Sequence, residues 1–582
     1  MPSKSDNNLS FNRSVIVTSA LPYANGEIHL GHVASTYLPA DIFTRYLKLS
    51  GREVYHLCAS DDFGTPIMIK AEALGKNPED YVKYWHDRDT EDFKSIGISF
   101  DLFSQTSSST NAQFVQCVFK ILQKNGHIYE NDVIQFYCET DLKFLPDRYV
   151  MGKCPFCGAE DQYSDLCEKC GRIPDKIIDP KCAVCGLKPV MRKSRHYFFN
   201  LSTFSKELEN WLNESKSLQS DVKKYVLHWI REGLHDWDIT RDIPWGIKIP
   251  TTNNETHTSD NSDNSKMEYK VFYGWFDNHL CYISTLADLL GGLESAKSKW
   301  NDSEIYHFIG KDIVYHHYLF LPAIRMGMKN EYKLPDFIPT RGHLMLENQK
   351  ISKSRNWYIG LKDFVKEFDR DYLRFYIASI SSYSQDDVNF DWDSFAEKIN
   401  NELINNIGNF INRTLSFCQK YFDKIPEPSD YDKEDQEISD RLTKIGGVVG
   451  HLLENNEVDK ALKEILTFSS FLNQYFQRKQ PWKDPQGANT LLFIAINAVR
   501  SLAIMLEPFI PFSAEKIWLQ LGIDRGGDGS DVHMQKWESL DHMCIKPGES
   551  LGKVEPLFKK IEPTQIKSQK QKLEIAIKNA KV

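Results

Sequence analysis

Residues 14–47 read SVIVTSALPYANGEIHLGHVASTYLPADIFTRYL. The run Val15-Ile16-Val17 is short and β-branched, and a cluster of Pro, Asn and Gly follows it, which predicts a buried strand that ends in a loop. Apolar residues then recur at helical spacing at Val33, Tyr37, Ile42 and Tyr46. His29 and His32 therefore lie where a strand leads into a helix, and such a junction is suited to binding anions through backbone N–H groups and the helix dipole.

The spacing HxxH alone does not establish such a site. Short motifs have a high rate of chance matches, and two partly buried histidines that complete a turn are the ordinary alternative. Other parts of the chain have to decide between the two interpretations.

Length and composition indicate a folded, multidomain protein. The chain has 582 residues, of which 41% are hydrophobic and 12% aromatic, and this length corresponds to about four domains. The first residues do not resemble a signal peptide, and the sequence lacks a membrane-length run of uninterrupted apolar residues, so a cytoplasmic protein without a membrane partner is expected. The net charge of −9 argues against nucleic-acid binding through the overall charge of the protein. Any contact with RNA therefore has to come from a local group of basic residues.

Twelve cysteines in a chain of this type indicate metal binding rather than disulfides. Cys154, Cys157, Cys167 and Cys170 form two CxxCG turns, a spacing that predicts a structural tetrahedral Zn²⁺ site. Redox-active CxxC pairs are the alternative, which three tandem pairs without a flanking βαβ pattern disfavour.

A third CxxCG turn, at Cys182 and Cys185, needs further ligands. Cys138 lies upstream in the same region, and either Asp141 or His196 is available as the fourth ligand. A second structural zinc site is therefore possible here.

Two later segments extend the interpretation of the HLGH stretch. Residues 305–312, IYHFIGKD, predict a strand that ends in glycine and charge, and KISKS follows at 350–354. The GK pair is not a P-loop because the upstream glycine is missing. KISKS alone is typical of a solvated loop, but together with HLGH it predicts the second half of a nucleotide site.

These segments resemble the class I aminoacyl-tRNA synthetases, and within them the methionyl-tRNA synthetases of the archaeal type. The resemblance covers nearly the whole chain and rests on TSALPYANGEIHLGH, ADIFTRYL, FLPDRYVMGKCPFCGAEDQ, ITRDIPWG, YHFIGKDIVYHH, KISKSRNW, DYLRFY and NNIGNFINR. It implies an α/β fold: a Rossmann-like catalytic domain, an inserted zinc-knuckle module and a C-terminal all-α anticodon-binding bundle. It also implies ATP with Mg²⁺, methionine and the methionine tRNAs as partners.

By the same resemblance, His29 and His32 hold the α-phosphate region of ATP, while Lys350 and Lys353 hold the leaving phosphates; these four are the expected catalytic residues. The other residues implied at ATP are Tyr23, Gly31, Gly310, Lys311, Asp312 and Ser352. The residues implied at methionine are Leu21, Tyr23, Asp61, Trp275, Tyr282, Ile313 and His317, with Asp61 as the partner of the substrate ammonium.

The match weakens around the expected methionine pocket. The family usually continues Ala-Pro-Ile-Gly-Tyr where this chain has Asn278, His279, Leu280, Cys281 and Tyr282. His316 replaces a usual phenylalanine, and Phe63 stands where a histidine is common. Either these exchanges are tolerated around the pocket, or they alter which amino acid is chosen.

Beyond Asp391 the pattern changes to long amphipathic helices. Apolar residues recur every fourth position at Phe395, Ile399, Leu403, Ile407 and Ile411, and Pro481 and Pro508 end helices. Asn409 and Arg413 are four residues apart and share one helix face, which is expected to point outward. The family resemblance assigns Asn409, Arg413 and Trp482 to the CAU anticodon.

The expected domain limits are 1–117 and 238–340 for the two halves of the catalytic domain and 118–237 for the zinc-bearing insertion. The KISKS and stem-contact region takes 341–390, the anticodon-binding domain 391–546 and a basic tail 547–582. Residues 251–266 are polar without periodicity and predict a surface loop. A monomer is expected.

Three functions remain open from the sequence. The leading one is a methionine–tRNA ligase. The second is a related amino-acid-activating enzyme that uses another amino acid or a non-tRNA acceptor. His279 and His316 favour the change of amino acid. The third is a zinc-bearing RNA-binding protein without catalysis, which the intact HLGH and KISKS motifs disfavour.

Overall fold

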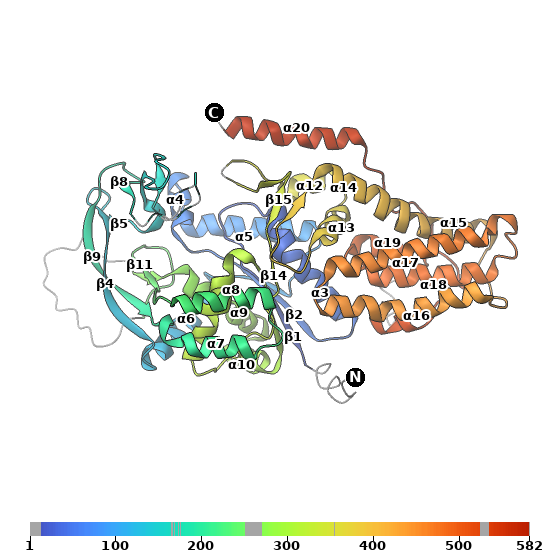
Figure 1. Cartoon of the computed structure of the whole chain (residues 1–582), viewed down its shortest axis with the longest axis horizontal. Helices are drawn as coiled ribbons and strands as arrows, with labels where there is room; N and C mark the ends of the chain where they lie inside the picture. Colours follow the sequence, from blue (N-terminus) through green and yellow to red (C-terminus); the bar gives the residue numbers. More distant parts are fainter. Residues whose placement is uncertain are drawn as a thin grey trace.

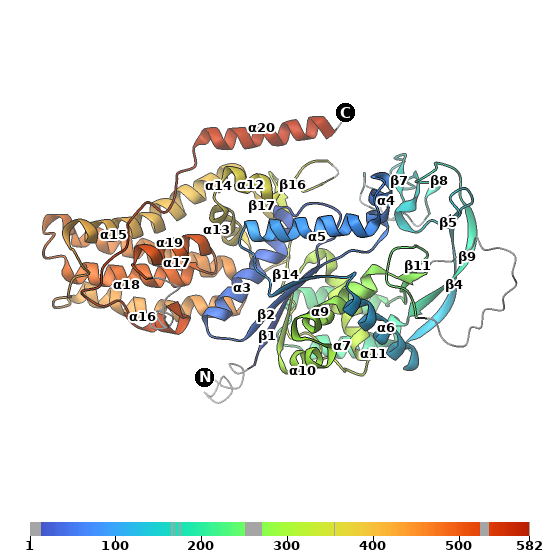
Figure 2. The same cartoon turned by 180° about the vertical axis from the view of Figure 1, so that it is seen from behind.

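The computed structural model describes residues 13–580 except 165–166, 168, 171, 173, 175, 251–269, 354 and 524–534. The predicted loop at 251–266 therefore lies outside the described residues. The molecule is elongated, with the half that was predicted to be catalytic (the catalytic half) in the middle, a ribbon module at one end and a helical bundle at the other (Figures 1 and 2).

A parallel sheet organises the catalytic half. Its five strands are β1 (Val15–Ser19), β2 (Val54–Ser60), β3 (Leu102–Gln105), β13 (Glu304–Gly310) and β14 (Thr340–Arg341), in the order β14-β13-β1-β2-β3. All four pairings are parallel. The strand order reverses at β1, whose neighbours are β2 on one side and β13 on the other, and ligands of open α/β sheets bind beside such a switch point.

Both faces of this sheet are covered by helices, as a parallel sheet requires. Successive side chains of a strand point to opposite faces. Accordingly, Val15 and Val17 belong to a core that continues into the helical bundle, while Ile16 belongs to the core on the other face. The helices of this half are α2 (Leu30–His32), α3 (Leu38–Leu49), α4 (Thr65–Ala73), α5 (Pro78–Ser95), α6 (Ser109–Lys124), α9 (Gly274–Leu290), α10 (Leu293–Asp302) and α11 (Leu321–Gly327).

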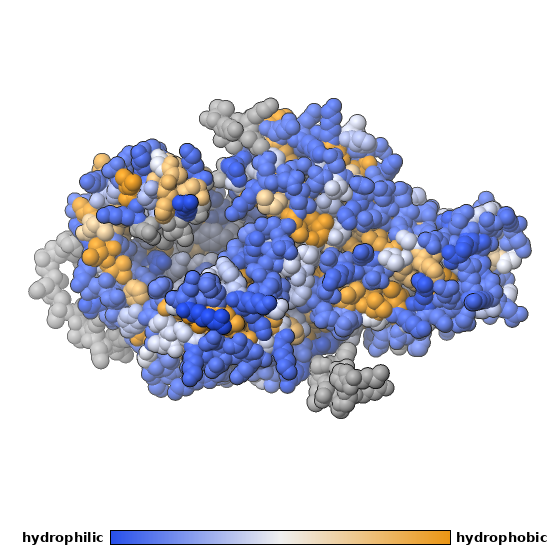
Figure 3. Space-filling view, viewed as in Figure 1, coloured by the Kyte–Doolittle hydropathy of each residue, from blue (hydrophilic) through white to orange (hydrophobic). Residues whose placement is uncertain are grey.

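The inserted module is a long antiparallel ribbon with small sheets at its far end (Figure 1). Its long strands are β4 (Ile128–Cys138) and β9 (Val190–Phe199), which pair over their full length. The shorter elements are β5 (Lys143–Phe144), β6 (Val150–Lys153), β7 (Gln162–Tyr163), β8 (Ile178–Cys182), β10 (Trp237–Asp238), α7 (Ser205–Glu214) and α8 (Ser220–Glu232). The hairpin β11 (Thr240–Arg241) with β12 (Val271–Phe272) returns the chain to the catalytic half. Exposed apolar side chains gather on this module (Figure 3), among them Ile134, Phe156, Val184, Leu187 and Met191.

A small sheet and two helices connect the catalytic half to the bundle. They are β15 (Leu344–Leu346), β16 (Gln349–Lys350), β17 (Val388–Phe390), α12 (Leu361–Glu367) and α13 (Arg370–Ile380). Arg374 on α13 is fully buried and donates to Asp41 on α3 at 2.7 Å and to the carbonyl oxygen of Pro508 at 2.7 Å. This guanidinium therefore joins the catalytic half to the bundle.

The bundle confirms the predicted amphipathic helices. A continuous helical stretch runs through α14 (Trp392–Lys398), the π-helix η6 (Ile399–Gly408) and α15 (Asn409–Tyr421), and the five residues predicted to face its core are fully buried. The remaining helices are α16 (Lys433–Glu454), α17 (Val458–Lys479), α18 (Asn489–Leu506), α19 (Pro511–Gln520) and the C-terminal α20 (Pro563–Ala580). Helices α17 and α18 end just before Pro481 and Pro508, as predicted.

Within the part of the chain that the structure describes, one helix, α18, is long and apolar enough to cross a membrane by length and composition, which the sequence interpretation did not anticipate. Almost all of that length is buried. It packs against α16, α17 and α19 as a core helix of the bundle.

The predicted basic tail forms α20, which packs on α14 through Ile566 and Leu573. Lys570 and Lys572 pair with Asp393 and Glu367 at 2.6 and 2.8 Å. Residues 563–580 of the tail are therefore helical, whereas residues 551–562 form neither helix nor strand. Part of the positive charge of the tail is already neutralised within the chain.

Candidate active site

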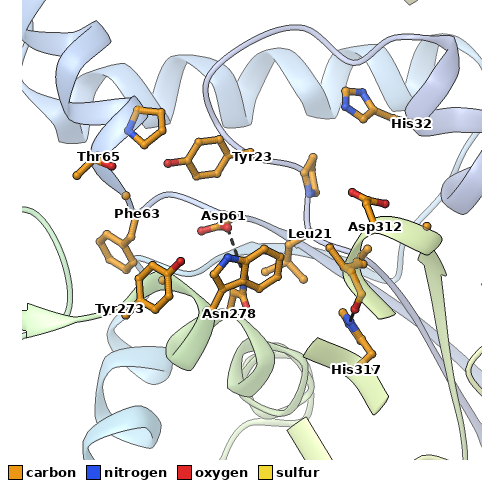
Figure 4. A pocket seen from close by; sticks show the side chains of 18 of the residues that line it. Leu21, Tyr23, His32, Asp61, Phe63, Thr65, Tyr273, Asn278, Asp312 and His317 are labelled. Carbon is orange, nitrogen blue, oxygen red and sulfur yellow. Dashed lines mark hydrogen bonds between the residues drawn. The ribbon is translucent and has the colours of Figure 1, made fainter. Parts of the chain in front are cut away.

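A cavity of about 610 Å³ lies at the carboxyl ends of β1, β2 and β13 (Figure 4). Leu21 follows β1, Asp61 follows β2, and Gly310 ends β13, so each of these strands delivers lining residues to the same opening. This is the position that the switch point of the sheet predicts.

All of the residues expected around methionine line this cavity: Leu21, Tyr23, Asp61, Trp275, Tyr282, Ile313 and His317. They come from segments that are far apart in the sequence. The hydroxyl of Tyr282 lies 2.9 Å from Nε2 of His317, whose Nδ1 lies 3.1 Å from the carbonyl oxygen of Ile313. The second of these contacts places a hydrogen on Nδ1, so Nε2 accepts from Tyr282.

Asp61 is the acid at the floor of this cavity. Oδ2 accepts a hydrogen bond from Nδ2 of Asn278 at 3.5 Å, and Oδ1 has no partner within the described residues. Burial, with the nearby Asp62 charge, raises the pKa of Asp61 to about 7. A bound cation would stabilise the ionised form, so the carboxyl group is suited to an ammonium ligand.

The unusual residues around this pocket separate into two groups. Asn278 and Phe63 line the cavity, whereas His279 and His316 are not among its lining residues. His316 stacks on the face of Trp275 with ring centroids 3.7 Å apart, and His279 is buried behind it with both ring nitrogens unpartnered among the described residues. The two histidines therefore support the cavity wall, and Asn278 and Phe63 are the exchanges that reach its interior.

The HLGH stretch lies where β1 leads into the helix, and its second histidine, His32, is at the other end of the cavity. His29 is the N-cap of α2: its Nδ1 accepts from the backbone N–H of Gly31 at 3.2 Å. Nδ1 of His32 accepts from the backbone N–H of His29 at 3.2 Å, and the two rings stack at 3.8 Å. His32 lines the cavity.

These contacts define the protonation of both rings. An imidazole whose Nδ1 accepts a hydrogen bond carries its proton on Nε2 when it is neutral. Burial lowers the pKa of His29 to about 3 and that of His32 well below its ordinary value, and the Lys353 charge contributes to both shifts. The pair therefore presents two neutral Nε2–H donors, which suit an anionic oxygen.

The two KISKS lysines differ in their surroundings. Lys353 is largely enclosed, and its Nζ lies 3.2 Å from the position that a Cβ on Gly26 would occupy, so the loop after β1 passes directly beneath the amine. Lys350 on β16 is exposed. Ser352 and Trp357 close the turn that contains Lys353 through two backbone hydrogen bonds of 2.9 Å. The structure thus brings Lys353 to HLGH and leaves Lys350 at the surface.

Lys311 and Asp312, which follow β13, have different surroundings. Asp312 lines the cavity with Gly310, and its Oδ1 lies 3.4 Å from Nε2 of His343. Lys311 instead pairs with Asp387 at 2.7 Å. A Cβ on Gly310 would lie 2.6 Å from Oδ1 of Asp312, so the close approach of this carboxylate favours glycine.

Several lining residues were not singled out from the sequence. Arg241 stacks on Tyr273 at 3.8 Å, and Nε1 of Trp245 donates to the carbonyl oxygen of Asp62 at 2.7 Å. Both Arg241 and Trp245 line the cavity and belong to the ITRDIPWG segment. That segment was recognised as a motif, but no residue in it was assigned to the site.

Two four-residue groups in the ribbon module have the arrangement of metal sites. The ligand atoms of Cys154, Cys157, Cys167 and Cys170 all lie within 4.8 Å of one another. Gly158, after the first of these CxxC turns, has a positive φ of 68°, a backbone conformation that favours glycine. This set fits a closed tetrahedral Zn²⁺ site.

The second group contains Cys138, Asp141, Cys182 and Cys185. Oδ2 of Asp141 lies 3.1 Å from Sγ of both Cys138 and Cys182. The alternative fourth ligand, His196, is wrong: it lies along the ribbon, within 3.1 Å of carboxylate oxygens of Asp238 and Asp242. Residue 196 is opposite residue 131 in the ribbon, far from the Cys138 end of β4.

The residues expected at the anticodon lie at the far part of the bundle. Asn409 and Arg413 line a shallow groove of about 320 Å³ between α15 and α17. Asn409 donates to the side-chain oxygen of Asn473 at 2.9 Å, and Arg413 donates to its backbone carbonyl at 3.2 Å. Arg413 also stacks on Phe476 and is half-buried, so the prediction that both side chains point freely outward holds only for Asn409. Trp482 is 45% exposed.

Comparisons with known protein families match two parts of the chain. The family described as "tRNA synthetases class I (M)" matches residues 15–415, which places the catalytic half in the class I tRNA synthetases. The family described as "Anticodon binding domain of methionyl tRNA ligase" matches residues 425–576.

The curated relatives narrow this class. The methionine–tRNA ligase of Methanopyrus kandleri is 41% identical over 572 residues, covering 96% of this chain and 81% of the relative. That of Pyrococcus horikoshii is 39% identical over 573 residues, covering 95% and 76%. The chain therefore belongs to the methionyl-tRNA synthetase family. The solved Mycobacterium tuberculosis methionyl-tRNA synthetase bound by methionyl-adenylate shares the fold, with a TM-score of 0.76, 20% identity and coverage of 94% of this chain and all of that one.

Proposed function

We propose that this protein is a methionine–tRNA ligase that forms methionyl adenylate from methionine and ATP and transfers the methionyl group to the terminal ribose of the initiator and elongator methionine tRNAs. The observation that carries the proposal is the joining of two predicted residue sets in one cavity: the methionine set around Asp61 and the HLGH end with His32. The protein acts as a monomer in the cytoplasm.

In the first step, a carboxylate oxygen of methionine attacks the α-phosphorus of ATP, and the bond between this phosphorus and the bridging oxygen to the β-phosphorus breaks. Asp61 holds the ammonium of methionine, with Leu21, Trp275, Tyr282, Ile313 and His317 around its side chain. The Nε2–H groups of His29 and His32 donate to the α-phosphate oxygens, where negative charge increases during attack.

Lys353 stabilises the pyrophosphate that leaves. Its ammonium lies beside the HLGH histidines, whereas Lys350 reaches the phosphates only if the exposed β16 turn moves toward the cavity. Mg²⁺ bound with ATP would neutralise further charge on the phosphates. Tyr23, Gly31, Gly310, Lys311, Asp312 and Ser352 complete the proposed ATP surroundings.

In the second step, a hydroxyl of the terminal ribose of the tRNA attacks the acyl carbon of the adenylate. The acyl–phosphate bond breaks, AMP leaves with the bond electrons, and the hydroxyl proton is released. Asn409 and Arg413 bond base edges of the anticodon, and Trp482 offers an exposed ring for base stacking.

The metal assignment has two parts. Cys154, Cys157, Cys167 and Cys170 hold one structural Zn²⁺, and Cys138, Asp141, Cys182 and Cys185 hold a second. Metal analysis of the purified protein is expected to give two equivalents of zinc, and Asp141→Ala is expected to reduce this to one. Two retained equivalents in Asp141→Ala would contradict the second ligand set.

ATP–pyrophosphate exchange with each standard amino acid tests the proposed activity. Methionine alone is expected to support exchange, because His279 and His316 are not among the residues lining the cavity. Exchange with a different amino acid would replace the proposal by the amino-acid-activating alternative.

A further inference from the structure

A buried polar network lies where the ribbon module joins the catalytic half, and it has no assigned role. Its centre is His196 on β9, whose side chain is 1% exposed. Nδ1 of His196 lies 3.0 Å from Oδ2 of Asp238, and Nε2 lies 2.9 Å from Oδ2 of Asp242. These two acids stand at the ends of the segment 238–242, so one imidazole ring spans the whole segment.

The rest of the network holds Asp242 from the other side. Its Oδ1 accepts from Nζ of Lys270 at 2.6 Å, and its Oδ2 accepts from the hydroxyl of Ser194 at 2.8 Å. The amide of Gln135 on β4 completes the group, with Nε2 at 2.5 Å from Oδ2 of Asp242 and at 2.8 Å from Nε2 of His196. Asp242 is thus joined to both long strands of the ribbon, β4 and β9.

The charges in this network favour a protonated ring. Two carboxylates at this distance stabilise an imidazolium, whereas the charge of Lys270 opposes it. Against the effect of burial, the hydrogen bonds to Asp238 and Asp242 raise the pKa of His196. Against the same effect, hydrogen bonds from His196 and Lys270 lower the pKa of Asp242 to about 2. His196 therefore joins the segment to the ribbon through charge-assisted hydrogen bonds, which are stronger than neutral ones.

Asp238 connects this network to the cavity. Among the described residues its charged partners are His196 and Arg241, whose Nη1 lies 3.4 Å from Oδ2 of Asp238. The same nitrogen donates to the backbone carbonyl oxygens of Asp238 at 3.3 Å and of Thr240 at 2.7 Å. The guanidinium of Arg241 stacks at 3.8 Å on Tyr273, which lines the cavity (Figure 4). One carboxylate is therefore shared by a buried ring of the ribbon and a cation at the cavity.

Arg241 has a distinct place in that cavity. Among the described lining residues it is the one arginine, and none of them is a lysine. An amino acid and its adenylate both carry anionic oxygens, and a fixed cation stabilises such oxygens only where its position is maintained. The contacts that hold the guanidinium therefore bear on substrate binding.

We propose that His196 is a positioning residue that fixes Asp238 and Asp242 against the ribbon and thereby holds the guanidinium of Arg241 at the cavity. The inference rests on the proposed function, because its kinetic effect requires an amino acid in this cavity. His196 touches neither substrate nor the reacting atoms; it acts through Asp238. Without the ring, Asp238 keeps Arg241 as its charged partner, and the guanidinium turns toward this carboxylate and away from Tyr273.

Pyrophosphate exchange tests the kinetic consequence. In His196→Gln, kcat/KM for methionine is expected to fall by about 10–100-fold, because a displaced cation no longer meets the substrate. His228→Gln replaces an exposed histidine on α8 and is the matched control, expected to keep the wild-type value. A wild-type kcat/KM in His196→Gln would overturn the proposal.

An Arg241→Ala background separates an effect through the guanidinium from a general one. Once that group is absent, adding His196→Gln is expected to lower kcat/KM by less than a factor of about two. A further loss as large as in the wild-type background would contradict the proposal. If His196→Gln does not fold, Asp238→Asn replaces it, with the same expected loss and the same lack of additivity with Arg241→Ala.

Crystal structures of ligand-free wild type and His196→Gln in one crystal form give a measurement that does not depend on activity. The guanidinium of Arg241 is expected to leave the ring of Tyr273 and to approach Asp238 in the variant. An unchanged Arg241 would overturn the positioning role. If no amino acid supports exchange with the wild type, the proposed function fails, while these two structures still decide whether His196 positions Arg241.

Discussion

The cavity and the anticodon groove are built in opposite ways. The cavity places partly buried groups such as Asp61 and His32 at the ends of a parallel sheet, and these groups have hydrogen-bond partners within the chain before a ligand arrives. The groove is shallow, and Trp482 beyond it is 45% exposed. Under the proposed function, the small substrates meet a preorganised site, whereas the tRNA supplies the base that covers the ring of Trp482.

The largest expected difference between the two regions is their response to acid. Burial lowers the pKa of His56 and His317 to about 4 and of His29 and His316 to about 3. These histidines bind protons near pH 6.5 only when unfolded, so the stability they contribute falls as pH drops from about 6.5 to about 4, by about 1.4 kcal/mol per histidine per pH unit.

The described histidines of the bundle, His451 and His542, are exposed. Hydrogen exchange at pH 7 and pH 5 is therefore expected to show protection lost first in β1, β13 and α9, and later in α17 and α18. Equal loss in both regions would contradict the assignment of the acid sensitivity to the cavity half.

Lys353→Ala is expected to have the next largest effect. Removing a cation directed at the developing charge of the leaving group should lower the rate of adenylate formation by about 10²–10³-fold. Methionine affinity should change little, because Lys353 is not among the residues that line the methionine end. Single-turnover adenylation gives the rate, and methionine binding to the ATP-free enzyme is the control. A wild-type rate would contradict the role of this lysine.

Trp482→Ala tests the exposed region alone. Loss of one base-stacking contact is worth about 1–3 kcal/mol, which corresponds to roughly 5–150-fold in kcat/KM for tRNA. Adenylate formation should stay within a factor of about two, because the ring lies on the bundle. Aminoacylation and pyrophosphate exchange measured on the same preparation give the comparison. A parallel loss of both activities would show that the two regions are not separable in this way.

The smallest expected effect is that of His279→Leu. Both ring nitrogens of His279 are buried without a partner among the described residues, so replacement by an apolar side chain should stabilise the protein by about 1 kcal/mol. Urea unfolding measures this change. The KM for methionine should be unaltered, because His279 does not line the cavity. A tenfold rise in that KM would make His279 a determinant of specificity after all.

The features that the sequence predicted are those set by residues close together in the chain or by family motifs. The strand at Val15, the helical face through Phe395 and Ile411, and the clustering of Cys154 with Cys170 follow from periodicity and spacing, because these depend on nearby residues. The seven residues expected at methionine, Asp61 among them, were predicted through the family motifs, and the structure brings all of them to one cavity.

The remaining features depend on how distant segments approach each other. Lys350 and Lys353 are equivalent in the motif, but the turn closed by Ser352 and Trp357 encloses only Lys353. Asn473 contacts Asn409 only because α15 packs on α17. The choice of Asp141 over His196 follows from the register of the ribbon. None of these relations is visible in local spacing.

Charging of unfractionated tRNA with labelled methionine, followed by sequencing of the acylated tRNAs, tests the central claim most directly. The account predicts that only initiator and elongator tRNAs with a CAU anticodon become acylated, at a rate that depends on Trp482. Exchange of pyrophosphate without charging, or charging of tRNAs with other anticodons, would contradict the claim that the enclosed cavity and the exposed groove serve one ligase.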